Sequence, residues 1–298
     1  MCEVGPAGQP EPLHTSGAVA SAVAGVGWQG GGVSTPDQTV AVVTGAARGF
    51  GREIARRLVA RGHRVLITDL DTDAVTATAA ELGVTAVTAD ARVPGDHARV
   101  AAAAAELGPV GVWVNNAGVL RAGQSWEQPD EDIALQVDVN LLGAVHGSRA
   151  AVRVMRKRGG HLLNIASMSA HGPVPGLAMY AATKAAVLSF STSLAGELDL
   201  AGLPIRVHAL CPDAADTALV RSEQERPDSA LLFCQRGLLT PEAVADAALR
   251  LLDGRRIVRT LPGHRAAAMR IAGTLPRLGL PVLARLRAQG ERRRTAGR

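Results

Sequence analysis

The chain of 298 residues is 47% hydrophobic and only 2% aromatic, which is enough for one large α/β domain or two small ones with a core of Ala, Val, Leu and Ile. Its net charge of +5 comes from one end: residues 265–298 sum to +8 and residues 1–264 to −3, so the main domain lacks the charge signature of a nucleic-acid binder. The spacings of Cys2, Cys211 and Cys234 fit neither a disulfide framework nor a zinc site, and no run of about 18 apolar residues is present to span a membrane.

The first 37 residues are a low-complexity segment. They are rich in Gly, Ala, Pro and Ser and show no hydrophobic periodicity, so we expect a disordered extension over 1–37. Because the first 38 residues contain no Lys or Arg, they match neither a secretory signal with a basic n-region nor an Arg-rich transit peptide. Together with the scattered cysteines, this predicts a cytoplasmic protein.

A strand and a glycine-rich turn open the first regular region. Residues 39–43 form a short apolar run typical of a strand buried on both faces, and TGAARGFG follows at 44–51. Gly45, Gly49 and Gly51 would let the backbone approach a pyrophosphate, which the N–H groups of a following helix would bind. A tight turn without a ligand is the alternative interpretation.

The next predicted strand, 64–69, ends in an acidic residue. Asp69 follows Gly51 by eighteen residues, where a carboxylate that binds the ribose of a dinucleotide is expected; alternatively, it caps the next helix. A carboxylate there repels the 2′-phosphate of NADP, so we predict that NAD is preferred and NADP is less favoured. Arg48 in the glycine turn is the counter-evidence, because a basic side chain can favour that phosphate.

Strands and helices continue to alternate along the chain. Further strands are predicted at 84–89, 110–114, 161–166, 205–210 and 256–260, and helices at 94–107, 129–158, 179–200 and 241–252. This alternation predicts an α/β fold, a Rossmann-like doubly wound parallel sheet of about seven strands with helices on both faces. Such sheets bind ligands at the carboxyl ends of their strands, where Asp69, Asp90, Asn115 and Ser167 lie.

Polar side chains within two predicted helices need a structural or functional reason. Asn140 lies inside 129–158, where asparagine is a mediocre helix former, so it indicates either a hydrogen bond that bends the helix or a site. Tyr180, the only tyrosine, and Lys184 are spaced to project side by side from one face of a helix. A lysine charge at about 4 Å could lower the tyrosine pKa from about 10 toward neutrality, as a proton shuttle requires. The alternative is a half-buried ring beside a solvated charge.

Taken in order, these motifs resemble the short-chain dehydrogenase/reductase family over residues 38–263. The matching elements are the glycine turn at 44–51, Asn-Asn-Ala-Gly at 115–118, Asn140, Ser167, and the Tyr-x-x-x-Lys motif of Tyr180 and Lys184. Ser167 lies thirteen residues before Tyr180, the spacing usual in that family. The resemblance divides the chain into an extension at 1–37, a Rossmann-fold dehydrogenase domain at 38–263 and a basic tail at 264–298.

The resemblance implies an oxidoreductase that transfers a hydride between NAD(H) and a secondary alcohol or ketone. Tyr180 would exchange a proton with the substrate oxygen, while Lys184 would lower the phenol pKa and hold the nicotinamide ribose. Ser167 would orient and polarise the carbonyl, and Asn140 would hold a water that links Lys184 to solvent. The family's usual pairing of its two long helices implies a homodimer or homotetramer, and no metal is implied.

The resemblance also implies a set of cofactor contacts. Asp90 would bond adenine, Asn115 would line the adenosine side and Thr217 would bond the carboxamide, although Asp90 and Thr217 also fit turn or cap positions. The complete set is Gly45, Arg48, Gly49, Phe50, Gly51, Asp69, Asp90, Asn115, Tyr180, Lys184 and Thr217. One position departs from the family pattern. The family usually has Pro-Gly-x-x-x-Thr here, and Asp213 takes the place of the glycine, which affects the backbone that carries Thr217.

Residues 214–240 are expected to form a substrate lid. Their apolar side chains predict an apolar alcohol or ketone, although a lid that packs on its own domain would look the same. Two other functions remain open: an NAD-binding regulatory or scaffold protein with little turnover, and a sugar epimerase or dehydratase, whose glycine turn is usually spaced differently. The complete set of Asn140, Ser167, Tyr180 and Lys184 favours the dehydrogenase.

The tail at 264–298 lies outside the resemblance. Between 269 and 286, apolar residues alternate with arginines, and Pro276 and Pro281 are expected to divide the segment into short pieces. One interpretation is a segment that lies on an anionic membrane, which would make the protein peripheral to it. The other is that the tail packs on its own subunit or on a neighbour.

Overall fold

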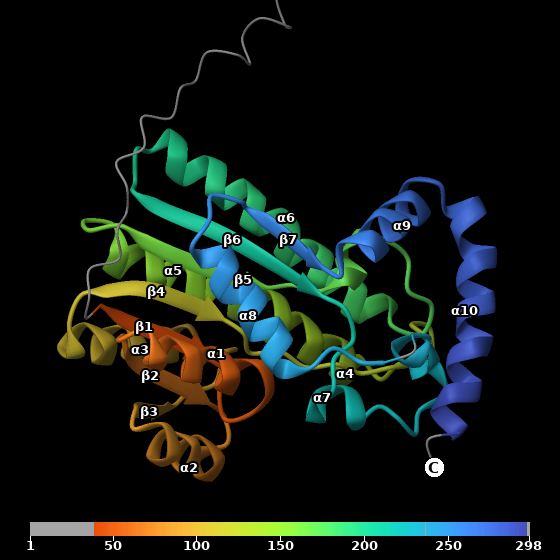
Figure 1. The fold of residues 1–298 in the computed structure, drawn as a ribbon, viewed down its shortest axis with the longest axis horizontal. Helices are drawn as coiled ribbons and strands as arrows, with labels where there is room; N and C mark the ends of the chain where they lie inside the picture. Colours follow the sequence, from red (N-terminus) through yellow and green to blue (C-terminus); the bar gives the residue numbers. More distant parts are fainter. Residues whose placement is uncertain (1–38, 236, 297–298) are drawn as a thin grey trace, which may run out of the picture. The chain divides into compact units, whose positions relative to one another are not determined.

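The computed structural model describes residues 39–235 and 237–296, and a sheet of seven parallel strands forms its centre (Figure 1). The strands are β1 (Val40–Thr44), β2 (Arg64–Asp69), β3 (Thr85–Thr88), β4 (Val110–Asn115), β5 (Gly160–Ile165), β6 (Ile205–Pro212) and β7 (Val258–Leu261). Their order, β3-β2-β1-β4-β5-β6-β7, is that of a doubly wound sheet and confirms the predicted fold class. The expected extension over 1–37 lies outside the described residues.

The winding of the sheet reverses beside β1, which positions the site. β1 pairs in parallel with both β2 and β4, so the chain builds outward from β1 first in one direction and then in the other. The loops that follow β1 and β4 therefore diverge and leave a crevice at the carboxyl ends of the strands.

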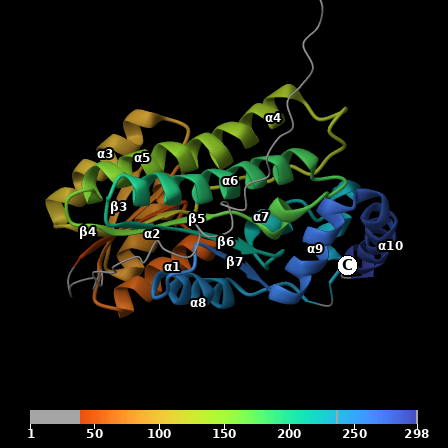
Figure 2. The same cartoon turned by 90° about the horizontal axis from the view of Figure 1, so that it is seen from above.

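Helices cover both faces of the sheet (Figure 2). One face carries α1 (Gly49–Ala60), α2 (Thr72–Leu82) and α8 (Pro241–Leu252), and its core includes Val43, Ile54 and Val244. The other face carries α3 (Pro94–Leu107), α5 (Gly143–Met155) and α6 (Ala178–Leu200), and its core includes Val42 and Trp113. Alternate residues of β1 thus enter opposite cores, as the side-chain alternation of a strand requires.

The helix predicted at 129–158 is present over residues 130–155, with a π-helical turn in its interior. It consists of α4 (Asp130–Gln136), a π-helical turn η1 (Val137–Leu142) and α5. Asn140 lies in this turn, and its side chain bonds both backbone groups of Val119: Oδ1 accepts from the N–H at 2.8 Å and Nδ2 donates to the carbonyl at 2.9 Å. A π-helical turn widens the helix locally, so one of the two predicted reasons for Asn140, a hydrogen bond that perturbs the helix, is present.

The C-terminal segment folds into two helices, α9 (Gly263–Thr274) and α10 (Pro276–Ala296). Pro276 separates them as predicted, but the expectation that Pro281 also interrupts the segment is wrong, because Pro281 lies inside α10. At this position proline removes a single hydrogen bond near the start of a long helix. α10 packs on α9 and on the 3-10 helix η3 (Pro227–Phe233). No helix in the described ranges has the length and apolar character needed to cross a membrane.

Candidate active site

A cavity of about 950 Å³ opens at the carboxyl ends of the strands, at the reversal point beside β1. Residues at or just after the ends of five strands line it: Thr44, Asp69, Asn116, Ile165 and Pro212. The cavity is continuous from the glycine turn, past the tyrosine and lysine, to an apolar end formed by the lid and the tail. The cavity therefore lies at the edge of the sheet where ligands were predicted to bind.

The glycine turn forms the first part of the cavity wall. Gly45 has φ +61°, and a Cβ there would lie 2.6 Å from the Cα of Ala117, so only glycine fits. Arg48, Gly49 and Phe50 also line the cavity, where α1 begins. A helix N-terminus with closely approaching backbone is suited to a pyrophosphate.

Gly51 lies behind the cavity wall, unlike Gly45 and Gly49 of the same turn. It does not line the cavity, and a Cβ there would lie 2.4 Å from the carbonyl oxygen of Gly45. It lets α1 pack closely against the turn.

Asp69 ends β2 at the cavity, in the place expected for a ribose-binding carboxylate. Its Oδ2 accepts a hydrogen bond from the N–H of Ala47 at 3.1 Å, so the carboxylate is held toward the glycine turn. Arg48, the counter-evidence, forms an exposed ion pair with Asp71 at 3.3 Å. The positive charge of Arg48 is thus already paired with Asp71, an acid that was not among the predicted site residues.

Asp90 also lines the cavity, and it has an unpredicted partner. Arg92 bonds its carboxylate at 2.6 Å, and this hydrogen bond holds the pKa of Asp90 below its usual range despite partial burial. Arg92 itself lines the cavity. This ion pair could have been anticipated from the sequence, because Arg92 follows Asp90 by only two residues.

Asn115 lies elsewhere than expected. It is buried behind the cavity wall, where Nδ2 donates to Asn164 Oδ1 at 2.8 Å and Oδ1 accepts from the indole of Trp113 at 2.8 Å. The next residue, Asn116, lines the cavity instead and donates to the carbonyl of Gly45 at 2.7 Å. Asn115 therefore ties β4 to β5, and the sequence analysis missed Asn116.

Tyr180 and Lys184 meet Ser167 on one wall of the cavity. Tyr180 is in the first turn of α6 and Lys184 lies one turn later; both side chains are buried. Lys184 Nζ donates to the carbonyl of Ile165 at 2.9 Å and lies 5.8 Å from the centre of the tyrosine ring. Ser167, two residues after the end of β5, forms a hydrogen bond with Tyr180.

The electrostatics of this group differ from the expectation. Burial raises the pKa of Tyr180 to about 12, and the hydrogen bond from Ser167 offsets only part of this effect. Burial also lowers the pKa of Lys184 to about 8. The expected lowering of the phenol pKa by Lys184 is absent because the ammonium is directed at a carbonyl and not at the phenol oxygen. Tyr180 is therefore a protonated hydrogen-bond donor at neutral pH.

Asn140 does not line the cavity, but it supports the residues that do. Its Nδ2 also lies 3.2 Å from Thr183 Oγ1, which joins η1 to α6. Gly118 separates Asn140 from the lysine: a Cβ at Gly118 would lie 3.2 Å from Asn140 Oδ1 and 3.5 Å from Lys184 Nζ. The water that Asn140 was expected to hold stays a prediction.

Thr217 lines the cavity, and the departure at Asp213 has a structural partner. Thr217 caps the short helix α7 (Ala218–Arg221), and its Cγ2 lies 3.6 Å from the Cβ position of Gly49, so the lid and the glycine turn adjoin. The carboxylate of Asp213 is paired with Arg265 of α9. Burial raises the pKa of Asp213, and Arg265 offsets part of that rise.

The apolar end of the cavity is built jointly by lid and tail. The lining side chains are Val174, Leu177, Leu219, Val220, Leu231, Leu232, Met269, Leu283 and Leu286. The sequence analysis included the lid but missed the three residues from α9 and α10. The tail thus packs on its own subunit, which was one of its two interpretations.

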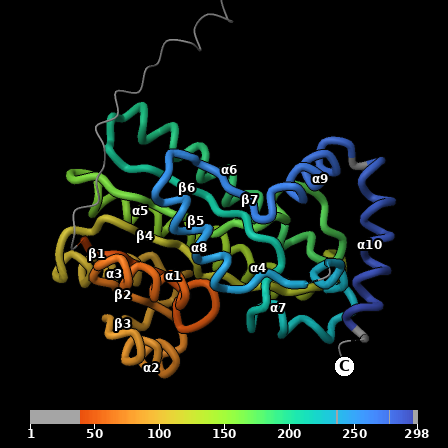
Figure 3. Tube along the Cα trace, viewed as in Figure 1, coloured from red at the N-terminus to blue at the C-terminus, as the bar shows by residue number. Residues whose placement is uncertain are grey.

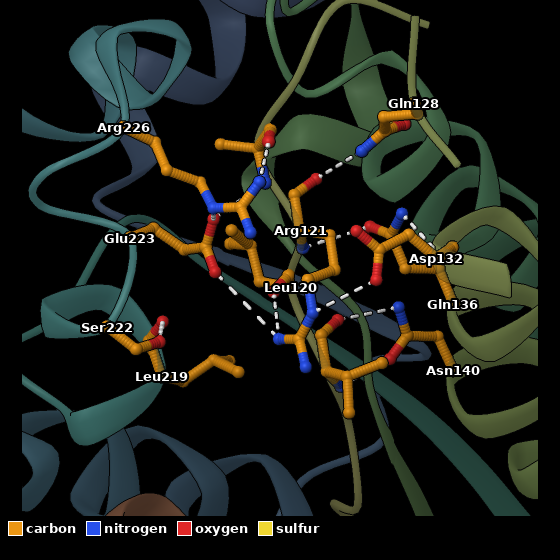
Figure 4. A network of polar contacts seen from close by, with 12 residues as sticks. Leu120, Arg121, Gln128, Asp132, Gln136, Asn140, Leu219, Ser222, Glu223 and Arg226 are labelled. Atoms are coloured by element: carbon orange, nitrogen blue, oxygen red, sulfur yellow. Dashed lines mark hydrogen bonds and ion pairs between the residues drawn. The ribbon is translucent and has the colours of Figure 1, made fainter.

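A polar network holds the lid to the loop after β4 (Figure 4). Glu223 of the lid is buried, and its Oε2 accepts from the N–H of Ala122 at 2.8 Å and pairs with Arg226 at 3.3 Å. Arg121 lies between Glu223 and Asp132 of α4, at 3.8 and 3.4 Å. The lid is therefore anchored at one point by a buried carboxylate.

Comparison with known proteins agrees with this geometry. A family model described as short chain dehydrogenase matches residues 39–228. The chain belongs to the short-chain dehydrogenase family. This confirms the resemblance inferred from the motifs, and it identifies an oxidoreductase family that acts on CH–OH and C=O groups.

Two curated relatives illustrate the similarity. The chain is 34% identical over 270 residues to the probable oxidoreductase EphD of Mycobacterium tuberculosis, an alignment that covers 84% of this chain and 45% of EphD. It therefore spans less than half the length of that relative. It is 43% identical over 191 residues to the 1-deoxy-11-beta-hydroxypentalenate dehydrogenase of Streptomyces exfoliatus, covering 61% of this chain and 69% of that protein.

Two solved structures show the same fold with a bound dinucleotide. A short chain dehydrogenase/reductase from Burkholderia phymatum in complex with NAD has a TM-score of 0.75 and 28% identity, covering 81% of this chain and 95% of that one. A variant of actinorhodin polyketide ketoreductase with NADPH has a TM-score of 0.69 and 30% identity, covering 76% and 97%.

Proposed function

We propose that this short-chain dehydrogenase transfers a hydride between NAD(H) and an apolar secondary alcohol or ketone. The observation that carries the proposal is one continuous cavity that joins the glycine turn and Asp69 to the Ser167, Tyr180 and Lys184 group. The turn fits a dinucleotide because its backbone leaves no room for a Cβ at Gly45 and ends at a helix N-terminus. The nicotinamide, when bound, supplies or accepts the hydride.

The protein side chains supply the proton and the orientation. Tyr180 donates a proton to the carbonyl oxygen of a ketone, since a phenol with a pKa of about 12 is protonated at neutral pH. Ser167 holds the phenol by a hydrogen bond and is placed to bond the same oxygen. Lys184 adds a buried positive charge beside them.

NAD is the cofactor that the residues around the turn favour. Asp69 presents a carboxylate to the position of the adenosine ribose, where it accepts bonds from a diol and repels a 2′-phosphate. Arg48 could neutralise such a phosphate, but it pairs with Asp71. Asp90 for adenine and Thr217 for the carboxamide remain proposals that their place on the cavity wall supports.

The substrate end of the cavity is apolar, which supports an apolar ketone. Of the side chains there, those of Leu177, Leu232 and Leu283 are buried from solvent. Desolvation of a carbonyl beside such groups strengthens its hydrogen bonds to Ser167 and Tyr180. A homodimer or homotetramer, and a cytoplasmic location, also stay proposals.

The test is a screen of the full chain against apolar ketones of increasing size, with NADH and NADPH in turn. We expect reduction with NADH at a kcat/KM at least about tenfold above that with NADPH, because a repulsion of about 1.4 kcal/mol corresponds to tenfold. Asp69→Asn should narrow this ratio, and Asp73→Asn, an acid on α2 that does not line the cavity, should leave it unchanged. Equal or tighter binding of NADPH by the parent protein would contradict the cofactor preference.

A further inference from the structure

The α9–α10 pair carries an unusual concentration of exposed apolar side chains. Eleven large apolar residues are exposed in the described part of the chain, and five of them lie within the twelve residues 271–282. We refer to these five as the α9–α10 patch: Ile271, Leu275, Leu278, Leu280 and Val282. Such a gathering marks an interaction surface, whereas single exposed apolar residues are ordinary.

The exposure of the patch does not reflect a loosely packed helix. The side of α10 that is turned toward the protein is buried: Leu283 is 6% exposed, it lines the cavity together with Leu286, and Gly290 lies against the backbone of Ala230 in η3. Leu278 and Val282, which are 68% and 54% exposed, lie on the ridge of α10 that continues to Leu286 at four-residue spacing. The apolar surface of α10 thus extends beyond the part that contacts the rest of the chain.

The charges around the patch are of one sign. No Asp or Glu occurs between Asp253 and Glu291. Arg277 and Arg285 are exposed, and neither forms an ion pair with a described residue.

Other arginines of the same helices are treated differently. Arg265 pairs with Asp213, and Arg287 pairs with Asp228 at 3.0 Å. Arg265 and Arg287 are therefore met by carboxylates, whereas Arg277 and Arg285 beside the patch are not. A partner that supplies both an apolar layer and negative charge would satisfy them.

We propose that the α9–α10 patch binds the surface of an anionic phospholipid membrane. Leu278 and Val282 enter the boundary between headgroups and acyl chains, and Arg277 and Arg285 contact lipid phosphates. An uncharged protein partner would leave the arginines unmatched, so the charge pattern favours the membrane over a second copy of this basic surface. This docking does not depend on the proposed hydride transfer, because it uses exposed side chains of α9 and α10 and none of the catalytic side chains.

The experiment is flotation of the full chain with vesicles of phosphatidylglycerol or phosphatidylcholine, at low and high salt. We expect binding to phosphatidylglycerol vesicles at low salt and at least about tenfold weaker binding to phosphatidylcholine or at high salt, since the arginine contribution is screened. Leu278→Ser with Val282→Ser should weaken binding at least about tenfold, and so should Arg277→Gln with Arg285→Gln. Leu200→Ser, at a 92% exposed leucine on α6, is the matched control and should bind as the parent does.

Two outcomes would overturn the proposal. One is the absence of binding by the parent protein at low salt, or unchanged binding by the Leu278 and Val282 variant. The other is a lower molecular mass of that variant in light scattering, which would identify the patch as an interface between copies of the chain. Thermal unfolding and NADH binding of every variant, expected to match the parent, confirm that each comparison is made between folded proteins.

Discussion

At the scale of single residues, the site is defined by burial more than by paired charges. Tyr180 and Lys184 are both almost inaccessible to solvent, so burial moves both pKa values toward the neutral forms. The adjacent lysine alone does not produce a tyrosinate. The two side chains are instead a protonated phenol and an ammonium of lowered pKa on one cavity wall.

Tyr180→Phe tests the role of the phenol. We expect kcat for reduction of a ketone to fall by about 10²–10⁴-fold, because the transferable proton is lost while the ring still fills its place. NADH affinity should change little. Ser167→Ala, which removes the hydrogen bond to the phenol but keeps the phenol itself, should lose less activity. Retention of more than about a tenth of the parent activity by the phenylalanine variant would exclude Tyr180 as the proton donor.

The pH dependence of reduction tests Lys184. The ammonium has a pKa of about 8, so it is charged below that pH and neutral above it, whereas Tyr180 with a pKa of about 12 stays protonated over the whole range. Activity that needs the ammonium should therefore be constant on the acid side of about 8 and fall on the alkaline side. The measurement is kcat for ketone reduction from neutral to alkaline pH, with NADH binding followed in parallel. A rate that stays level or rises through this window would contradict the requirement.

At the scale of elements, the strands could be predicted closely and some site residues could not. The predicted strand 64–69 has the bounds of β2, because an unbroken apolar run between polar residues defines a buried strand. The turn η1 was hidden because it depends on bonds from Asn140 to Val119, twenty-one residues away. Whether Asn115 or Asn116 faces the cavity is decided by the alternation at the end of β4, which the sequence alone does not locate.

The ion pair between Asp213 and Arg265 joins β6 to α9 and can be tested by a double-mutant cycle. Arg265→Met leaves a largely buried carboxylate without a countercharge, so we expect a loss of about 1–3 kcal/mol in the free energy of unfolding. Asp213→Gly together with Arg265→Met should recover most of this loss. Urea unfolding of the parent, both single variants and the double variant measures the coupling.

The same pair has a defined dependence on pH. The pKa of Asp213 is raised in the folded protein, so the native state holds its proton more tightly than the unfolded chain, and the contribution of this group to stability declines as pH rises. Without Arg265 the pKa rises further. The destabilisation by Arg265→Met should thus be smaller near about pH 4, where Asp213 is protonated, than near about pH 7. An equal loss at both values would show that the pair stabilises by packing alone.

At the scale of the whole molecule, the cavity is assembled from segments that are far apart in sequence. The family model matches 39–228, which supplies the glycine turn, Asp69 and the group around Tyr180. Met269, Leu283 and Leu286 come from beyond that range and close the apolar end. The matched range thus supplies the glycine turn and the group around Tyr180, while segments outside it form part of the apolar end of the cavity.

A further consequence follows from α10 being a wall with a different environment on each side. Leu283 contacts whatever fills the cavity, and Val282, the preceding residue, is 54% exposed to solvent. A ketone that orders α10 from inside and a lipid surface that orders it from outside would each leave less conformational entropy for the other to remove. Thermodynamic reciprocity then requires that vesicles raise the affinity for the ketone by the same factor by which the ketone raises the affinity for vesicles. Both factors can be measured: the change in ketone affinity caused by vesicles, and the change in vesicle affinity caused by the ketone. In the Leu278→Ser/Val282→Ser variant both factors should approach one. The comparison would show whether a single helix couples the binding of two ligands that never touch.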